Sequence, residues 1–594
     1  MTLENNLTRV HAKLNNRTTS NQEDLAFAKQ TSSIIKHSYK GKYKPVAKKK
    51  LPVPVSIPDI VPQRTNYGKI EIPTRKPLPT HPPSIDNFPY SDRLTKERIN
   101  KIISNVPQNF LHKEELDLLL HVLHRNELAI AFEDSERSTF KRKYFPDYIM
   151  ETVPHVPWQL PPIRVPKAVE EPMTELLRNQ EAAGNLEPSR GSYRSRVFVV
   201  AKPTGGLRVV HDLQPLNAVS VRDSMLPPNI NDFAESFVGY SVYGVIDLYS
   251  GYHQRTLHEI SRPLTACHTT IGNMQLTSLP MGYTNSMQEF QRTTSHATAH
   301  LTPDRAGVFV DDIGIKGPKT RYNDEPIPEN PNIRRFIWEY ADTFDEMLAT
   351  LVEVGGSAAG KKMVLATPIV HIVGSVCSLE GRRPHHSIIA KVLKWPTPKN
   401  PTDVRGFLGT AGVARKWIWQ YAAIAKPLTL LTRIQTHEFQ WNDKAEKAMQ
   451  TLKEAITSLP ALKVLDIQLA KVKLPNERSN DIGLVTLAVD SSPIAVGFVL
   501  YQTLEDGRHP IHYGSITWND VEARYSQPKI ELYGLFRALK ALRYDLWGIH
   551  FRIEVDAKFL KQMINTPDLP GAAITRWIAY AYLFDFEITH VPAT

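Results

Sequence analysis

Val308-Phe309-Val310-Asp311-Asp312-Ile313-Gly314-Ile315 places two adjacent aspartates between apolar runs. This pattern predicts a strand, a tight turn and a second strand, with both carboxylates at the tip. Residues 242–247 form another apolar run that ends in a carboxylate, Asp247. If the two strands are neighbours, Asp247 and Asp311 supply the oxygen ligands that hard divalent cations prefer. The sequence therefore indicates a site equipped for two-metal phosphoryl transfer.

The length of 594 residues exceeds what one hydrophobic core holds, so we expect three or more domains. With 41% hydrophobic residues and nine tryptophans, the chain can fill such cores. Two cysteines, Cys267 and Cys377, cannot build a disulfide framework, which favours a reducing setting inside the cell. No apolar run reaches membrane-spanning length and the N-terminus lacks a hydrophobic leader. We therefore expect a soluble intracellular protein without membrane contact.

The net charge of +11 is unevenly distributed, because residues 1–50 hold eleven Lys/Arg against three Asp/Glu. Residues 51–90 contain ten prolines, too many for the interior of a helix or sheet. We expect residues 1–90 to be a largely disordered arm and linker. The basic part either binds phosphate backbones through counterion release or is a solvated tail, and the composition favours neither.

Residues 91–165 are predicted to form a helical lead-in segment. Helical periodicity begins near Thr95, and the leucines between residues 116 and 120 give a short amphipathic helix. Residues 131–158 are aromatic and basic. Such a stretch can touch nucleic acid through stacking and charge, but a packed segment is the favoured interpretation.

A basic β-hairpin is predicted next. Residues 193–203 form its first strand, residues 204–206 its turn and residues 207–212 its second strand. Lys202 and Arg208 would offer a point charge and a forked charge to a triphosphate. Surface hairpins often carry a Lys and an Arg, so this signal is modest by itself.

Four motifs between residues 208 and 312 share the order and spacing of one known family. They are Arg208-Val-Val-His-Asp-Leu-Gln-Pro-Leu-Asn217, Asp247-Leu-Tyr-Ser-Gly-Tyr-His-Gln254, Leu279-Pro-Met-Gly-Tyr-Thr-Asn-Ser286 with Phe290-Gln-Arg292, and Phe309-Val-Asp-Asp312. The set resembles the fingers and palm of reverse transcriptases from long-terminal-repeat retrotransposons of the Ty3/gypsy group. The Phe-Val-Asp-Asp variant and the insert at residues 319–332 look most like elements of fungal genomes.

The resemblance continues beyond the palm. Residues 355–362 look like the lysine-bearing segment after the catalytic hairpin, and residues 372–374 resemble the primer-grip strand. The segments that resemble thumb and connection are residues 395–398, 404–409 and 424–428. This similarity implies fingers and palm at residues 166–378, with thumb and connection at residues 379–475.

Residues 476–594 are predicted to be a separate domain. A strand ends at Asp490, an amphipathic helix begins at Glu531, and an alternating strand ends at Asp556. This order resembles ribonuclease H, and it implies that the three carboxylates bind metal and cleave the RNA of an RNA–DNA hybrid. Ribonucleases H of this family carry a fourth carboxylate beyond the position of Thr594. We therefore expect an incomplete domain that binds metal poorly and cleaves weakly or not at all.

The implied fold is α+β: a right-hand polymerase, a connection and an incomplete ribonuclease H-like α/β domain. By the resemblance, Asp247 and Asp311 hold two Mg²⁺ ions, with Mn²⁺ as a substitute. The backbone carbonyl of Leu248 would assist, and Asp312 would support the site more than it ligates.

The resemblance also implies residues that bind the incoming nucleotide. Tyr252 would lie against the sugar and reject a 2′-hydroxyl, the alternative being a packed core tyrosine. Gly282 would let the backbone approach the nucleotide, because it has no Cβ. Lys361 and Lys362 would protonate the departing pyrophosphate, the alternative being ordinary surface lysines.

The resulting hypothesis is an RNA- and DNA-templated DNA polymerase of a retrotransposon with an attached ribonuclease H domain. Its partners would be an RNA template, a DNA primer, an RNA–DNA hybrid and deoxynucleoside triphosphates. The implied location is a cytoplasmic particle or the nucleus. Two alternatives stay open: a catalytically inactive nucleic-acid-binding remnant and an RNA-dependent RNA polymerase. The ribonuclease H segment and Tyr252 count against the second.

Overall fold

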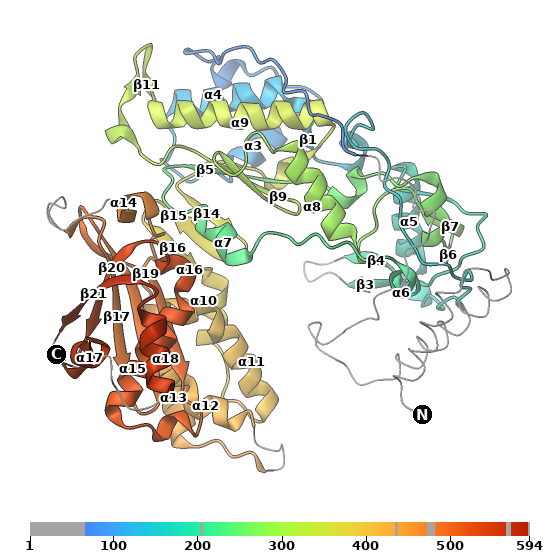
Figure 1. Ribbon diagram of the computed structural model, residues 1–594. Coiled ribbons are helices and arrows are strands. Elements are labelled where there is room, and N and C mark those ends of the chain that lie inside the picture. The colour runs from blue at the N-terminus through green and yellow to red at the C-terminus, as the bar shows by residue number, and fades with distance from the viewer. Residues whose placement is uncertain are drawn as a thin grey trace, which may run out of the picture. The chain divides into compact units, whose positions relative to one another are not determined.

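The computed structural model describes residues 66–201, 206–433, 438–471, 481–556, 558–565 and 572–591 (Figure 1). Residues 1–65 of the arm and linker predicted over residues 1–90 lie outside these ranges. Two compact units divide the chain. The first comprises residues up to Pro228, Gly244–Gly317 and Tyr322–Thr367; the second comprises Asn229–Tyr243, Pro318–Arg321 and residues from Pro368 onward. No helix among the described residues is long and apolar enough to cross a bilayer.

The centre of the first unit is a four-stranded sheet in the order β13-β5-β9-β8. The strands are β13 (Val364–Thr367), β5 (Tyr243–Asp247), β9 (Asp312–Lys316) and β8 (Ala306–Phe309). Helices α8 (Ser286–Ala297) and α9 (Arg335–Val354) pack against β8 and β9 and touch one another. The predicted hairpin is confirmed, because β8 and β9 pair antiparallel with Phe309 opposite Asp312. The sheet therefore presents Asp311 at a two-residue turn.

A smaller subdomain of the first unit contains the predicted basic hairpin. Its strands β3 (Val197–Ala201) and β4 (Leu207–His211) pair antiparallel, which confirms the prediction, while residues 202–205 between them lie outside the described residues. The other elements are α5 (Lys167–Ala182), β2 (Leu186–Pro188), α6 (Gln214–Val219), β6 (Cys267–Thr269) and β7 (Gly272–Leu276). Strands β2, β7 and β6 form one sheet, whose core includes Met173, Leu177 and Cys267.

The lead-in segment packs on helix α9. It contains α3 (Lys96–Ile103), α4 (Lys113–Arg125) and β1 (Ile130–Ala131), which pairs with β12 (Ala358–Ala359). Helix α4 runs along α9 (Figure 1), and its buried apolar face confirms the predicted amphipathic helix. Phe140, Tyr144 and Phe145 are almost fully buried. The packed interpretation of these aromatics is thus confirmed.

The structure differs from the predicted linker over residues 66–90. There, the Tyr67 hydroxyl donates to Glu289 Oε1 at 2.7 Å, and Arg75 pairs with Asp345 at 2.7 Å. Proline content carries no information about such tertiary contacts, which explains the difference. The insert after the palm hairpin forms β10 (Pro326–Ile327) and β11 (Asn330–Arg334), and Arg334 pairs with the buried Glu115 of α4 at 2.7 Å.

The second unit joins a helical layer to a sheet domain. The helical part comprises α7 (Ile230–Glu235), the antiparallel strands β14 (Ile369–Ile372), β15 (Ser375–Ser378) and β16 (Gly381–Pro384), and helices α10 (His386–Leu393), α11 (Pro401–Ala411), α12 (Tyr421–Leu431) and α13 (Asp443–Thr457). Helices α10 to α13 share one core that includes Phe407, Leu428 and Leu452. The short helix α14 (Ile467–Lys471) leads toward the sheet domain.

The sheet domain has five strands in the order β19-β18-β17-β20-β21. They are β17 (Val485–Ser491), β18 (Ala495–Leu504), β19 (Gly507–Thr517), β20 (His550–Val555) and β21 (Asp585–His590). Strands β17, β18 and β19 are antiparallel, whereas β17, β20 and β21 run parallel. The helices are α15 (Gln527–Ala541), α16 (Arg543–Leu546), α17 (Lys558–Asn565) and α18 (Ala572–Ala581).

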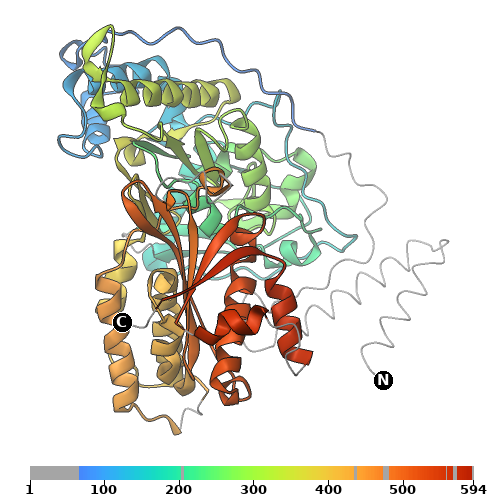
Figure 2. The ribbon, with the colours of Figure 1, turned by 60° about the vertical axis from the view of Figure 1, so that its left-hand side comes forward.

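Opposite faces of this sheet carry different helices (Figure 2). On β18, Val496 packs toward Gly534 of α15, while the adjacent Gly497 faces Trp419 and Gln420 at the start of α12. Successive residues of a strand point to opposite faces. Helix α15 therefore covers one face and the α12 end of the helical layer covers the other.

Candidate active sites

The turn that carries Asp311 is held in an unusual backbone conformation. Val310 has a φ of +59°, a left-handed value that is rare for a β-branched residue. Two side chains of helix α8 hold the Val310 backbone in this conformation. Gln291 Oε1 accepts the Val310 N–H at 2.7 Å, and the Thr294 hydroxyl donates to the Val310 carbonyl at 3.1 Å. Gln291 Nε2 also donates to the Val308 carbonyl at 3.2 Å. Such conformations persist where neighbours over-determine them, and they cluster at functional sites.

Asp247 and Asp311 are brought together at the ends of neighbouring strands β5 and β9. The backbone N–H of Leu248 donates to the backbone carbonyl of Asp311 at 3.0 Å, so the main chain is joined directly beside the two aspartates. The Asp311 side chain reaches solvent, but the surrounding palm partly dehydrates it and raises its pKa, and the Asp247 charge raises it further. Burial, followed by the charges of Asp311 and Asp247, raises the pKa of Asp312 to about 6.

Lys362 places a positive charge at these carboxylates. Its Nζ lies 2.9 Å from Asp247 Oδ2, and its charge lowers the pKa of Asp311 and Asp312 against the effects that raise them. The donor set fits a hard cation, because it offers carboxylate oxygens and an excess of negative charge that a cation would relieve. Within the described ranges, no three His, Cys, Asp or Glu side chains already form a metal-holding group. Metal binding here therefore stays a prediction.

Tyr252 and Leu248 lie beside the aspartates. Tyr252 belongs to the 3₁₀ turn Gly251–Gln254, and its ring packs edge-on against Phe290 at 5.3 Å between centroids. Burial raises the Tyr252 pKa and the charge of Asp311 adds to the effect, which places this ring close to the aspartate. Leu248 buries its side chain and turns its backbone toward the turn that carries Asp311.

Gly282 is exposed and has a φ of +91°, a conformation that favours glycine. Asn217 of α6 fixes this loop, because its Nδ2 donates to the Gly282 carbonyl at 2.9 Å and its Oδ1 accepts the Thr284 N–H at 2.8 Å. Arg208 is exposed on β4 and makes no side-chain hydrogen bond or ion pair with the rest of the described chain. Lys202 lies outside the described residues. The nucleotide-binding roles of these residues stay predictions.

A second cluster of carboxylates lies in the five-stranded sheet domain. Asp490 lies near the end of β17, and Asp556 comes just after β20. Each aspartate directly follows one member of the pair Val489 and Val555, which lie opposite one another in the parallel pairing of the two strands. Glu531 of α15 is only 5% exposed. Burial, then the charge of Asp556, raises the Glu531 pKa to about 7. Burial and the charge of Asp556 also raise the Asp490 pKa, so the three predicted carboxylates share one electrostatic environment.

Gln420 is a contact residue that sequence analysis missed. It precedes α12 in a left-handed conformation, and its Nε2 donates to Asp490 Oδ2 at 2.6 Å. The next turn is tied to the same sheet, because the Ala422 N–H donates to the Ser515 hydroxyl at 2.7 Å. Seventy residues separate Gln420 from Asp490. No local pattern signals such a contact.

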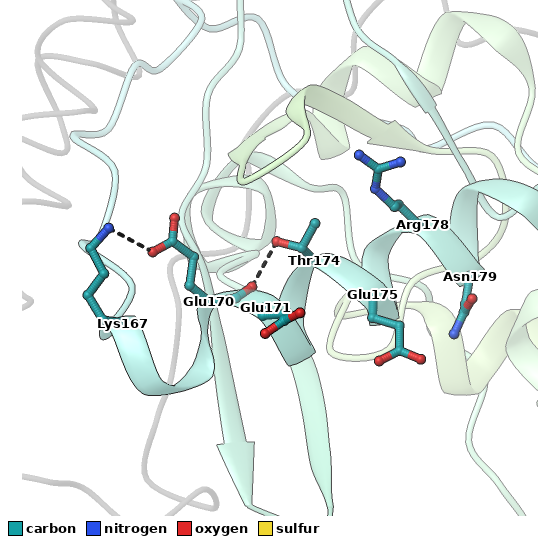
Figure 3. Close-up of a pocket in the computed structure, with 7 residues that line it drawn as sticks. All are labelled: Lys167, Glu170, Glu171, Thr174, Glu175, Arg178 and Asn179. Atoms are coloured by element: carbon teal, nitrogen blue, oxygen red, sulfur yellow. Dashed lines mark hydrogen bonds and ion pairs between the residues drawn. The ribbon is translucent and has the colours of Figure 1, made fainter.

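The hollow drawn in Figure 3 lies elsewhere, along the exposed face of α5. Its lining residues are Lys167, Glu170, Glu171, Thr174, Glu175, Arg178 and Asn179. Lys167 pairs with Glu170 at 3.4 Å, and the Thr174 hydroxyl donates to the Glu170 carbonyl at 2.7 Å. Charges of both signs are interspersed there, as on a solvated helix face. None of the predicted catalytic residues lines this hollow.

A palm sheet with strand-end aspartates, followed by a five-stranded domain with three converging carboxylates, defines the class of polymerases joined to a ribonuclease H-like domain. A family profile described as "RNase H-like domain found in reverse transcriptase" matches residues 484–584. The Pol polyprotein of transposon 297 from Drosophila melanogaster is 26% identical over 509 residues, covering 84% of this chain and 44% of that protein.

The Tf2-3 transposon polyprotein of Schizosaccharomyces pombe is 23% identical over 441 residues, covering 73% of this chain and 31% of that protein. The chain thus spans less than half the length of these curated relatives. These matches support a reverse transcriptase and ribonuclease H region, similar to that of Pol polyproteins of the Ty3/gypsy type of long-terminal-repeat retrotransposons.

Solved structures share the fold. The foamy viral protease-reverse transcriptase in complex with dsDNA has a TM-score of 0.69 at 18% identity, covering 84% of this chain and 97% of that chain. The same viral enzyme with an RNA/DNA hybrid has a TM-score of 0.62, covering 84% and 64%. The α+β architecture of a polymerase with a ribonuclease H-like domain is thereby confirmed.

Proposed function

We propose that this chain is an RNA- and DNA-templated DNA polymerase with an attached ribonuclease H-type nuclease. The observation that carries the proposal is the meeting of Asp247 and Asp311 at the ends of adjacent strands, joined by the Leu248–Asp311 hydrogen bond of 3.0 Å. Two Mg²⁺ ions, or Mn²⁺ in their place, would activate the primer hydroxyl and neutralise the departing pyrophosphate when bound there.

The side chains around the aspartates have distinct tasks in this proposal. Asp247 and Asp311 would hold the cations, and Asp312 would support them from β9. Lys362, whose Nζ lies 2.9 Å from Asp247 Oδ2, would turn to the pyrophosphate and donate a proton to it. Tyr252, packed on Phe290, sets the space for the sugar and excludes a 2′-hydroxyl. The backbone at Gly282 lies against the nucleotide, since no Cβ intervenes.

The proposed partners are an RNA template, a DNA primer, their hybrid and deoxynucleoside triphosphates. Support comes from the solved neighbours, which are complexes with dsDNA and with an RNA/DNA hybrid. Lys202 and Arg208 would meet the triphosphate from the fingers. We place the protein inside the cell, in a cytoplasmic particle or the nucleus, because its two cysteines form no disulfide framework.

Primer extension tests the polymerase. The full chain should extend oligo(dT) on poly(rA) with Mg²⁺ and dTTP, whereas Asp311→Asn should abolish extension, since one carboxylate of the cation site is lost. Asp92→Asn is a matched control, because Asp92 is an exposed aspartate of the lead-in segment, and its variant should extend normally. Binding of the primer–template without extension by the parent chain would instead support the inactive nucleic-acid-binding remnant.

A labelled RNA–DNA hybrid tests the nuclease. Asp490, Glu531 and Asp556 would hold two cations with water as the nucleophile. The expectation that this chain cleaves the hybrid weakly or not at all stays a prediction. Rapid cleavage that Asp490→Asn abolishes would overturn that expectation and leave the nuclease assignment standing. Cleavage that survives Asp490→Asn would refute the assignment of this site.

A further inference from the structure

The turn that carries Lys362 is held from behind by the lead-in segment. Asn105 follows α3, and its Nδ2 donates to the carbonyl of Met363 at 2.9 Å and to that of Lys361 at 3.3 Å. One amide therefore grips the backbone on both sides of Lys362. The N–H of Asn105 donates to the Ile102 carbonyl at 3.1 Å, which ties the grip to α3.

The same turn is packed as well as hydrogen-bonded. Gly360 lies directly against the Phe132 ring, and a Cβ at this position would collide with it. Phe132 is 4% exposed and follows β1, whose Ala131 is opposite Ala359 in the parallel pairing with β12. The buried Ile99 and Ile102 anchor α3 in turn. The lead-in segment thus fixes the backbone position of the turn Gly360–Lys362.

The position of the turn decides what Lys362 can reach. Its side chain is 67% exposed, yet its Nζ lies 2.9 Å from Asp247 Oδ2. The amino group of a long flexible side chain stays at such a position only if the backbone that carries it is fixed. We propose that Asn105 is a positioning residue for Lys362, so that the lead-in segment is part of the polymerase active site; this inference rests on the proposed function.

Kinetics of single-nucleotide incorporation test the proposal. Asn105→Ala should lower the maximal incorporation rate by between about 10-fold and 10²-fold, as small displacements of a reacting group do. The apparent dTTP affinity should change little. In the Lys362→Ala background the same substitution should cost nothing more, because the residue it positions is gone. Asn100→Ala removes an exposed asparagine from the same helix and should keep the parent rate.

The proposal would be overturned if the rate losses of Asn105→Ala and Lys362→Ala multiply in the double variant. It would also be overturned if Asn105→Ala incorporates nucleotides at the rate of the parent chain. A second measurement does not depend on polymerase activity. After reductive ¹³C-methylation, the NMR signal of Lys362, assigned by its absence in Lys362→Arg, should shift in Asp247→Asn. It should shift likewise in Asn105→Ala and not in Asn100→Ala.

The two measurements separate the two claims. A Lys362 signal that is unchanged in Asn105→Ala refutes the positioning, whatever the incorporation assay gives. The Lys362 signal could instead shift as expected while the chain shows no primer extension that Asp311→Asn abolishes. That result refutes the proposed polymerase, and the positioning of Lys362 by Asn105 still holds.

Discussion

Replacing Glu531 by glutamine should stabilise the metal-free sheet domain at alkaline pH. Burial and the neighbouring carboxylates raise the Glu531 pKa from 4.5 to about 7. At about 1.4 kcal/mol for each pH unit between these values, the ionised side chain costs the folded domain about 3 kcal/mol. Because Glu531 is only 5% exposed, solvent relieves little of this cost. Glutamine keeps the acceptor for Gln527, which now donates to Glu531 Oε1 at 2.5 Å.

The pH dependence has a definite sign. Below pH 4.5 the carboxyl is protonated in both the folded and the unfolded chain, so it costs nothing. As the pH rises toward about 7, the unfolded chain loses the proton first, and stability falls. The wild-type domain should therefore lose about 3 kcal/mol between pH 4.5 and 8 through this group. Glu531→Gln should remove that loss.

Amide hydrogen exchange in the presence of EDTA measures this pH dependence of stability within the sheet domain itself. The opening free energy of β17 amides should fall with pH in the wild-type chain and fall much less in Glu531→Gln. Glu505→Gln, an exposed position between β18 and β19, should behave as wild type. Equal pH dependence in wild type and Glu531→Gln would refute the account of a strained carboxylate cluster.

The remaining predictions concern single side chains. Tyr252→Val should incorporate ribonucleotides that the parent rejects, in a direct rNTP against dNTP comparison; unchanged discrimination would favour a purely packed tyrosine. Gln291→Ala leaves the buried N–H of Val310 without its acceptor, so the palm should lose about 1–3 kcal/mol by urea unfolding and most of its extension activity; full activity would contradict the role of the held turn. Gln420→Ala removes the hydrogen bond that favours ionised Asp490 and should weaken Mn²⁺ binding about 10-fold by electron paramagnetic resonance, in a chain whose palm aspartates are replaced by asparagine. Unchanged Mn²⁺ affinity would remove Gln420 from the site.

The parts of the site that lie on regular strands were predictable from the sequence. Alternating and apolar runs place Asp247, Asp311 and Asp490 at strand ends, and strand pairing then brings the carboxylates together. The hairpin of β3 and β4 followed from its glycine-rich turn in the same way.

What could not be predicted is the support around these carboxylates. Gln291, Gln420 and Asn105 each act through a side-chain contact with a distant backbone or carboxylate. Polar residues of this kind look the same in sequence whether they are solvated or buried against a partner. The contacts of Tyr67 and Arg75 escaped for the same reason, because a proline-rich composition says nothing about a buried ion pair.

Anomalous diffraction from Mn²⁺ in crystals with a primer–template and an incoming nucleotide tests the central claim most directly. The account predicts density between the carboxylates of Asp247 and Asp311, and its loss in Asp311→Asn. Manganese bound elsewhere, or no peak beside these aspartates in a complex that holds the nucleotide, would contradict it.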